Sequence, residues 1–264
     1  MRLVTWNVNS VRARLERVVA FCERAAPDVL ALQETKCTAE AFPREPLEAL
    51  GYEVAAAGHS QWNGVALLSR VGLADVEEGF PGQPAWGDPP RTEARALGAT
   101  CGGVRVWSLY VPNGRTLDDP HLAYKLDWLA RLRDAAAAWR TADPGAAVAL
   151  VGDWNIAPAD DDVWDPTAFV GSTHVSPAER AAFAAVGDAG YREVTREHLP
   201  EPHTFTYWDY QRLRFARREG MRIDLAYASR ALADRVTGVR VDRDERKGKG
   251  ASDHAPVVLD VADA

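Results

Sequence analysis

Residues 147–155 read AVALVGDWN and join an apolar run to a polar end. The apolar part, 147–151, is typical of a buried strand. Asp153 and Asn155 follow Gly152 and are two positions apart, so at a strand end their side chains would share one face. A Gly-Asp-x-Asn turn more often bonds its own backbone, and for this segment alone that alternative stays open. Whether the pair is functional therefore depends on the polar residues at other strand ends.

Strands and helices are expected along the whole chain. Apolar runs predict strands at 3–6, 28–33, 52–57, 64–69, 94–100, 104–111, 147–151, 204–207, 223–228, 239–241 and 257–261. Helices are expected at 11–26, 120–139, 177–189 and 230–235. Asn9 or Ser10 can cap the first helix, Asp119 the second, and Ser176 the third through a capping box. Because strands dominate and the helices are amphipathic, the pattern predicts an α/β sandwich of two packed sheets with helices outside.

The composition describes an ordinary globular chain. It has 264 residues, 47% hydrophobic and 26% charged, with no linker or low-complexity segment, which favours a single domain over 1–264. The N-terminus passes directly into a strand pattern and no long apolar run occurs, so a soluble cytoplasmic protein without membrane contact is expected. Three scattered cysteines, Cys22, Cys37 and Cys101, are interpreted as packed thiols.

The charge balance limits the possible partners. A net charge of −7 argues against a protein that coats nucleic acid non-specifically, but it does not exclude an enzyme that processes a polyanion. Only four of the 31 basic residues are lysines, and arginine suits bidentate contacts to phosphate. An arginine-rich composition can equally reflect the base composition of a genome.

Six predicted strand ends carry polar groups. These groups are Asn7, Glu34, Tyr110, Asp153 with Asn155, Asp224, and Asp253 with His254. Each has a simple structural explanation, such as a helix cap, a surface carboxylate or a turn. Together they favour one site, because loops at one edge of a sandwich converge in space.

The chemistry that these groups suit is metal-assisted hydrolysis of a phosphodiester. Oxygen ligands without thiolates favour Mg²⁺, with Mn²⁺ as an alternative ion, and Glu34 is the expected ligand. Asp153 is placed to orient and deprotonate water, and an Asp224–His254 pair would keep an imidazolium beside an anion. A serine-nucleophile triad is the competing interpretation of His with Asp. It is disfavoured because no Gly-x-Ser-x-Gly segment is present.

Seven short segments occur in a recognisable order: WNVNSVR at 6–12, QETK at 33–36, YVPNG at 110–114, GDWN at 152–155, WDY at 208–210, RID at 222–224 and SDHAP at 252–256. From Leu3 to about Leu259 the chain thereby resembles the exonuclease III family of abasic-site endonucleases, within the endonuclease, exonuclease and phosphatase superfamily. The QETK, YVPNG and WDY segments narrow the resemblance to the DNA-repair branch. It implies a four-layered α/β sandwich with one catalytic domain.

The resemblance also implies roles for individual residues. It implies that Glu34 binds the metal, with Asn7, Asp153, Asn155 and Asp253 near it. The expected catalytic residues are Tyr110, Asp153, Asn155 and the Asp224–His254 pair. Whether Asp153 or that pair is the general base stays open. The expected DNA contacts are Lys36, Asn113 and Arg115. The pocket for the abasic sugar is expected to be lined by Tyr207, Trp208, Met221 and Ile223. Met221 departs from relatives that carry tryptophan at this position, which implies a looser pocket rim.

The function expected from the resemblance is DNA repair. A monomeric, Mg²⁺-dependent nuclease would cut the backbone of double-stranded DNA 5′ to abasic sites and trim 3′ ends exonucleolytically. Two alternatives remain. One is a phosphodiesterase or phosphatase of the same superfamily that acts on lipid or inositol phosphates. The other is a nucleic-acid-binding regulator that keeps the fold without catalysis, against which the complete set of catalytic residues speaks.

Overall fold

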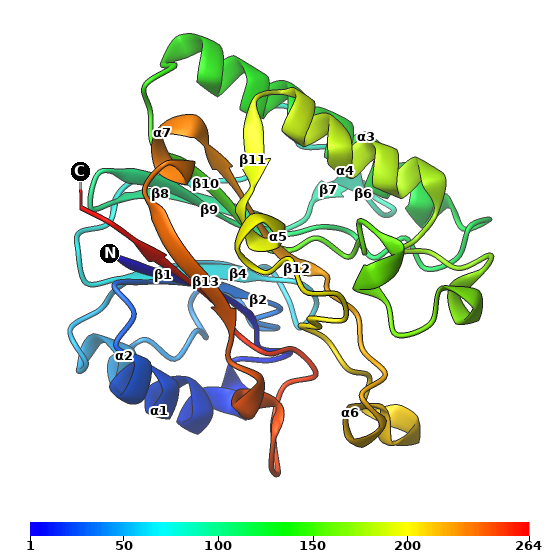
Figure 1. Cartoon of the computed structure of the whole chain (residues 1–264). Coiled ribbons are helices and arrows are strands. Elements are labelled where there is room, and N and C mark those ends of the chain that lie inside the picture. The colour runs from blue at the N-terminus through cyan, green and yellow to red at the C-terminus, as the bar shows by residue number, and fades with distance from the viewer. Residues whose placement is uncertain (264) are drawn as a thin grey trace.

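Two six-stranded mixed sheets lie face to face in this protein, with helices on both outer sides, as Figure 1 shows. The structure is a computed structural model, and it describes residues 1–263. The expected four-layered α/β sandwich is confirmed.

The first sheet has the strand order β13-β14-β1-β2-β4-β3. Its strands are β1 (Arg2–Asn7), β2 (Val29–Gln33), β3 (Glu53–Ala57), β4 (Val65–Ser69), β13 (Val236–Val241) and β14 (Val257–Val261). Strands β1 and β2 are parallel, and Asn7 is paired with Gln33. This register places Glu34, the next residue after β2, beside the end of β1.

The second sheet has the strand order β11-β12-β10-β9-β8-β5. Its strands are β5 (Ala74–Glu78), β8 (Ala96–Cys101), β9 (Val104–Tyr110), β10 (Val148–Asp153), β11 (Tyr191–Glu193) and β12 (Asp224–Ser229). Strand β10 runs parallel to β9 and antiparallel to β12, so Asp153 is paired with Tyr110 on one side and Asp224 on the other. A small separate hairpin joins β6 (Ala85–Trp86) to β7 (Arg91–Thr92).

The helices are α1 (Leu15–Ala25), α2 (Glu45–Glu48), α3 (Pro120–Ala142), α4 (Pro177–Asp188), α5 (Val194–His198), α6 (Arg214–Arg217) and α7 (Arg230–Ala233). Short 3₁₀ turns occupy Arg12–Arg14, Asp160–Asp162, Pro166–Phe169, Gln211–Leu213 and Arg243–Arg246. Figure 1 shows α1 and α2 outside the first sheet and α3 and α4 outside the second. Within residues 1–263, no helix has the length and apolar character needed to cross a membrane.

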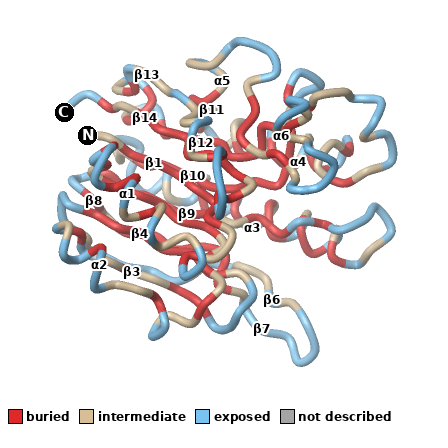
Figure 2. Tube along the Cα trace, turned by 90° about the horizontal axis from the view of Figure 1, so that it is seen from below, coloured by how far each residue is buried: buried red, intermediate tan, exposed pale blue. Residues whose placement is uncertain are grey.

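Three layers of apolar side chains hold the sandwich together. The layer between the sheets is built mainly of Val, Leu and Ala, and the buried strands lie at the centre of Figure 2. Larger aromatic residues fill the outer layers, such as Trp6 and Phe21 under α1 and Trp107 and Trp128 under α3. Because the two sheets pack through small, branched side chains, they can approach closely. The loops at one end of the sandwich then meet.

Two of the three helix caps predicted from the sequence are present in the structure as expected. Asp119 accepts a hydrogen bond from the backbone N–H of His121 at 2.7 Å, and Ser176 forms the expected capping box with Glu179. The expected cap is only partly found: Ser10 Oγ accepts the backbone N–H of Ala13 at 3.4 Å in the 3₁₀ turn at Arg12–Arg14, but α1 itself begins at Leu15 without a side-chain cap. Asn9 and Ser10 both have positive φ. The chain turns there towards the ends of the neighbouring strands instead of entering the helix.

One expected strand is absent. Residues 204–207 form no strand, and Tyr207 makes only isolated bridges to Met221 and His254. Strand β5 was not expected from the sequence, because all five of its residues are exposed and three of them are acidic. The cysteines are all buried and unpaired, as expected.

Candidate active site

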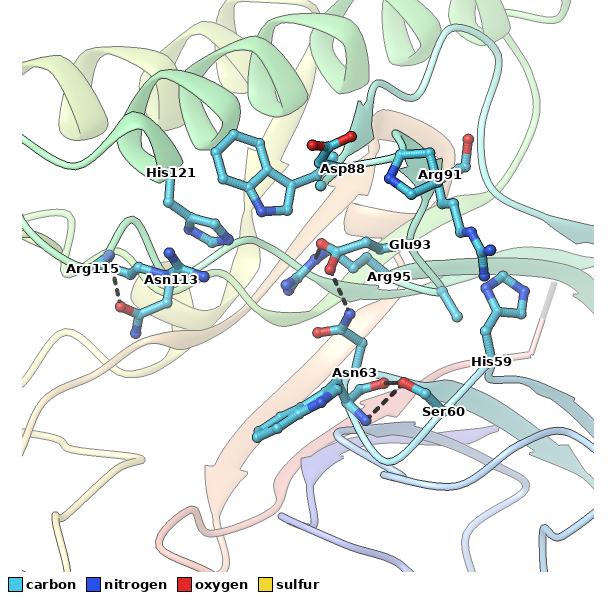
Figure 3. A pocket seen from close by; sticks show the side chains of 16 residues that line it. His59, Ser60, Asn63, Asp88, Arg91, Glu93, Arg95, Asn113, Arg115 and His121 are labelled. Atoms are coloured by element: carbon cyan, nitrogen blue, oxygen red, sulfur yellow. Dashed lines mark hydrogen bonds and ion pairs between the residues drawn. The ribbon is translucent and has the colours of Figure 1, made fainter.

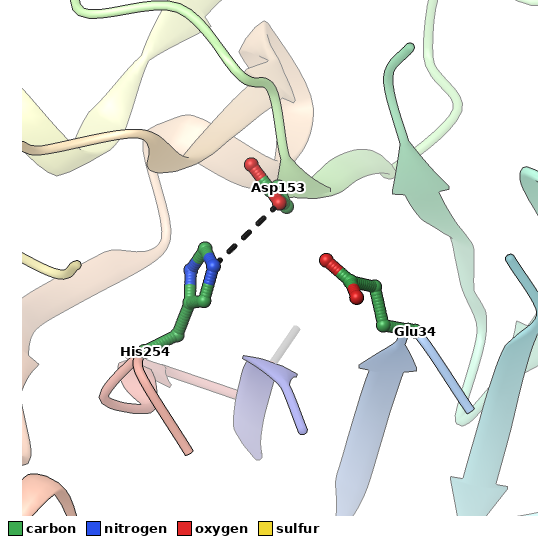
Figure 4. A group of neighbouring side chains, drawn as sticks. All are labelled: Glu34, Asp153 and His254. Carbon is green, nitrogen blue, oxygen red and sulfur yellow. Dashed lines mark ion pairs between the residues drawn. The ribbon is translucent and has the colours of Figure 1, made fainter. Parts of the chain in front are cut away.

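Acidic side chains from both sheets meet at one end of the sandwich. Figure 4 shows Glu34, Asp153 and His254 pointing towards a common centre. Glu34 follows β2 of the first sheet, Asp153 ends β10 of the second, and His254 precedes β14. The strand ends that the sequence predicted to converge therefore do converge.

Gly152 allows β10 to approach its neighbour closely. A Cβ atom at this position would lie 1.8 Å from the carbonyl oxygen of Leu109, so only glycine fits. The next residue, Asp153, then uses its two carboxylate oxygens differently. Oδ1 accepts the backbone N–H of Asn155 at 2.9 Å, and Oδ2 accepts the side-chain amide of Asn7 at 2.9 Å. One oxygen thus closes the self-bonded turn, and the other faces the neighbouring polar side chains.

Asn7 links the two carboxylates. Its Nδ2 donates to Glu34 Oε1 at 2.8 Å as well as to Asp153 Oδ2. Its Oδ1 accepts the backbone N–H of Asn9 at 3.0 Å, and this bond sets the orientation of the amide. Asn7 was expected near the metal as a ligand. In the structure its nitrogen faces the two carboxylates, so in this arrangement Asn7 holds the two acids together.

The donor set fits a hard divalent cation. Glu34, Asp153 and His254 each offer one possible ligand atom, and these three atoms lie within 4.8 Å of one another. Among residues 1–263, no other group of His, Cys, Asp or Glu side chains brings three such atoms together. Burial raises the pKa of Asp153 to about 7, and the Asp224 and Glu34 charges add to the effect. A cation between Glu34 and Asp153 would relieve that repulsion, and carboxylate oxygens suit Mg²⁺ or Mn²⁺.

Glu34 is ionised in this setting. Burial opposes its charge, but the ammonium of Lys36 and the amide of Asn7 outweigh burial and lower the pKa of Glu34. Lys36 Nζ lies 2.7 Å from Glu34 Oε2 and also donates to the side chain of Asn9. Asn9 in turn donates to Asp253 Oδ1 at 3.0 Å. Asp253 therefore lies at the rim of the site and outside the group formed by Glu34, Asp153 and His254.

His254 is held as a cation by Asp224. Its Nδ1 lies 2.8 Å from Asp224 Oδ2, and its Nε2 lies 3.9 Å from Asp153 Oδ2. Burial alone would lower the pKa of His254, but these carboxylates outweigh burial and raise it to about 10. A protonated imidazole is a poor metal ligand, so His254 is better suited to contact an anionic phosphate. The ring packs against Tyr207, with centroids 4.8 Å apart.

This raised pKa predicts how stability depends on pH in metal-free protein. The folded state binds the His254 proton more tightly than the unfolded chain does, so the stabilisation is complete below about pH 6.5. It is lost as the pH rises through about 10. Thermal unfolding with chelator, followed between these pH values, should therefore show a falling midpoint. His254→Gln should flatten the decline, and an unchanged slope in that variant would assign the effect to other groups.

Tyr110 lies at the end of β9 beside the carboxylates. Burial and the charge of Glu34 raise the pKa of its hydroxyl well above the usual range, so the phenol stays protonated and can donate. The guanidinium of Arg95 lies over its ring, 4.7 Å from the centroid. Asn155 Nδ2 donates to the Val111 carbonyl at 2.9 Å, while its Oδ1 lies 3.2 Å from Asn113 Nδ2.

A cavity of about 280 Å³ opens over these groups. Its lining comprises Asn9, Glu34, Lys36, Tyr110, Asn113, Asp153, Asn155, His174, Tyr207, Met221, Ile223, Asp253 and His254. Most of the residues singled out in the sequence therefore lie in one place. Asn7 and Asp224 are wholly buried and support the lining residues from below.

Two of the expected site residues, the pocket residue Trp208 and the DNA-contact residue Arg115, do not line this cavity. Trp208 was expected in the pocket, but it is buried against Phe205 and Ala255 and faces a separate hollow. Neighbouring residues in an extended segment point to opposite sides, so Tyr207 enters the cavity and Trp208 does not. Arg115 is exposed and lines a neighbouring groove, where it pairs with Asp119 at 3.6 Å.

Two lining residues, Asn9 and His174, were missed. Asn9 was considered only as a helix cap, although it lies inside the WNVNSVR segment. His174 Nε2 lies 3.1 Å from Asn155 Oδ1 and 3.2 Å from Asn113 Nδ2. Burial and the nearby ammonium of Lys125 lower the pKa of His174 to about 3, so the ring is neutral. No sequence signal marks His174, because it lies in a loop without a motif.

A larger groove of about 760 Å³ adjoins the cavity. Figure 3 shows Asn113 and Arg115 at one end of it and His59 and Arg91 at the other. Trp62 also lines it, with 68% of its surface exposed. Asn113 lines both the groove and the cavity, so the two hollows lie next to each other.

Comparisons with known proteins agree with this arrangement. The family described as "Endonuclease/Exonuclease/phosphatase family" matches residues 4–254. Exodeoxyribonuclease III of Haemophilus influenzae is 31% identical over 97% of this chain and 98% of its own. A 3′-5′ exonuclease from Neisseria meningitidis is 37% identical, with a TM-score of 0.93 over 99% of this chain and 100% of its own. An AP endonuclease from Archaeoglobus fulgidus is 31% identical, with a TM-score of 0.91 over 99% of both chains.

The matches extend over nearly the whole length of the chain and include the segments that carry the carboxylate group, Glu34 and Asp153, and the Asp224–His254 pair. A catalytically silent protein on this fold is therefore not supported. The chain belongs to the endonuclease/exonuclease/phosphatase family, in its exonuclease III and AP endonuclease branch, and is a phosphodiester-cleaving enzyme.

Proposed function

We propose that the protein is a Mg²⁺-dependent DNA repair nuclease that cuts double-stranded DNA 5′ to abasic sites and trims 3′ ends. The observation that carries this proposal is the shared Asn7 amide, which holds Glu34 and Asp153 together opposite the Asp224–His254 pair. Acids that can hold a cation thus face a fixed positive charge that can hold a phosphate. This arrangement suits in-line hydrolysis of a phosphodiester.

Asp153 is the proposed general base. Burial raises the pKa of Asp153 to about 7 in the metal-free protein, so this carboxylate can take the proton of the attacking water near neutral pH and pass it to solvent. The Asp224–His254 pair is less suited to this step, because His254 already carries its proton up to about pH 10. A Mg²⁺ ion held by Glu34 would polarise the phosphate and stabilise the charge on the leaving oxygen.

The remaining groups would stabilise the phosphate during the reaction. The imidazolium of His254 and the phenol of Tyr110 are donors that stay protonated at neutral pH. Asn155 and Asn113 add amide groups at the cavity wall. Donors fixed before the substrate arrives stabilise developing negative charge more effectively than water does.

The cavity wall supports recognition of a sugar without a base or of a strand end. Tyr207, Met221 and Ile223 form its apolar side, next to the carboxylates. A flipped-out abasic sugar or a frayed 3′ nucleotide can enter a small pocket that a paired nucleotide cannot reach. Similarity to a 3′-5′ exonuclease supports activity at 3′ ends, and similarity to an AP endonuclease supports cleavage at abasic sites.

The adjoining groove is the proposed path of the DNA. Arg91 and Arg115 can contact backbone phosphates, and the exposed ring of Trp62 can pack against a sugar or base. We propose further that the protein acts as a monomer, since one chain supplies all the groups named for the reaction, and that it acts in the cytoplasm, as the sequence leads us to expect. The half-buried cation Lys36 at the cavity edge would add a phosphate contact.

The test is cleavage of three labelled duplexes, one with a single abasic analogue, one with a recessed 3′ hydroxyl and one with a 3′ phosphate. Each is incubated with Mg²⁺, with Mn²⁺ and with chelator, and an inositol phosphate and a phospholipid serve as rival substrates. We expect cleavage of DNA that requires the metal, with the products reporting which ends are made. Turnover of the lipid or inositol substrate without turnover of DNA would reject the proposal.

A further inference from the structure

A wholly buried ion pair lies directly behind the active-site loops. Lys125, on α3, has its Nζ 2.6 Å from Glu179 Oε1, on α4, and neither side chain is exposed. No role in the proposed reaction requires either residue. A buried ion pair often contributes little to folding, because removing two charges from water offsets their attraction. The pair therefore calls for an explanation other than stability.

Lys125 holds the backbone of two loops that carry cavity residues. Its Nζ donates to the carbonyl of Asn155 at 2.6 Å and to the carbonyl of Asn113 at 3.1 Å. Asn155 has a φ of +51°, in the left-handed region, which costs energy for a residue other than glycine. A charged donor on its carbonyl is well placed to hold this conformation.

Glu179 holds the third loop. Its Oε1 accepts the hydroxyl of Thr173 at 2.7 Å and the backbone N–H of His174 at 2.9 Å. The side chain of His174 then meets the side chain of Asn155 in the cavity. Three loops distant in sequence thus converge on one buried ion pair through four hydrogen bonds.

We propose that Lys125 and Glu179 are positioning residues, which fix Asn155, Asn113 and His174 in the geometry that the reaction needs. The inference deepens the proposed function and rests on it. The pair touches no reacting atom, and it acts through the backbone of these loops. Its loss should therefore lower the rate of the chemical step more than it weakens substrate binding.

The test separates positioning from folding with a neutral double variant. Lys125→Met alone leaves Glu179 buried and unpaired, and it should unfold at a lower temperature. Adding Glu179→Gln removes that charge and keeps an acceptor for Thr173 and His174, so the unfolding midpoint should recover. The kcat of the double variant on the preferred DNA substrate should stay about 100-fold low, with KM changed much less, because misplaced groups lose rate.

Tyr191→Phe is the matched control. Its hydroxyl donates to the Ala136 carbonyl of α3 at 3.1 Å, away from the site, so the variant loses a buried bond to the same helix. It should unfold earlier and keep its kcat. Recovery of both kcat and the unfolding midpoint in the double variant would overturn the inference and make the pair merely structural.

The positioning role can also be tested without activity, in the event that the unaltered chain cleaves no DNA at all. That result would reject the proposed function. The crystal structure of the double variant would still test the positioning role. Asn155 outside the left-handed region, or His174 moved from Asn155, would support it. Unchanged loops would overturn it.

Discussion

Asp153→Asn is expected to lower kcat on duplex DNA by about 10³-fold, within the range that a general acid or base contributes. The substitution keeps the shape of the side chain and an oxygen that can accept the Asn155 N–H, but it removes the proton acceptor and the oxygen that accepts the Asn7 amide. Single-turnover cleavage at saturating Mg²⁺ measures the chemical step directly. A rate within about threefold of the unaltered protein would remove Asp153 from this role and leave the Asp224–His254 pair as the candidate base.

Stability provides a control on the same variant. Burial raises the pKa of Asp153, which means that the folded metal-free protein disfavours its charge. Replacing the carboxylate by a neutral amide should therefore leave the unfolding midpoint at pH 8 unchanged or higher. A loss of activity together with higher stability cannot be ascribed to unfolding. Asp127→Asn, at a half-exposed position on α3, should alter neither quantity.

Glu34→Gln is expected to lower kcat/KM by about 10³-fold at low Mg²⁺, because a metal ion contributes several kcal/mol to stabilising a phosphoryl transition state. The amide keeps the size of the side chain and an oxygen for the Asn7 hydrogen bond, but it removes the charge and with it the ion pair to Lys36. The concentration of Mg²⁺ that gives half-maximal rate should rise by at least about tenfold. Calorimetric titration of Mn²⁺ into both proteins checks the loss of affinity directly.

Two outcomes would contradict this assignment. Equal Mn²⁺ affinity in the unaltered protein and Glu34→Gln would place the metal elsewhere. Equal activity of the unaltered protein with chelator and with Mg²⁺ would remove the metal from the mechanism. Glu77→Gln is a suitable control, since that carboxylate is exposed and pairs only with Arg105 in the second sheet. It should leave both the metal affinity and the rate unchanged.

The sequence was sufficient to predict the sandwich and most of the residues that line the candidate site, because both predictions depend on local patterns. Apolar runs that end in polar residues mark strands whose ends point one way, as the segments before Asn7, Glu34 and Asp153 do. Proline and cap residues marked the starts of α3 and α4. Where local patterns were weak the prediction failed, as at the exposed strand β5 and at residues 204–207, which pair with other segments only through isolated bridges.

The sequence by itself determined which groups are available: carboxylates, amides and one histidine at strand ends, and the order in which they occur. Only the tertiary structure decided what each one does. It turned the Asn7 nitrogen between two acids, kept Trp208 out of the cavity, brought His174 into it, and paired Lys125 with Glu179 behind it. The physical reason is that strand and helix patterns depend on neighbours in sequence. Hydrogen-bond partners and pKa shifts instead depend on register and packing between residues that are far apart in the chain.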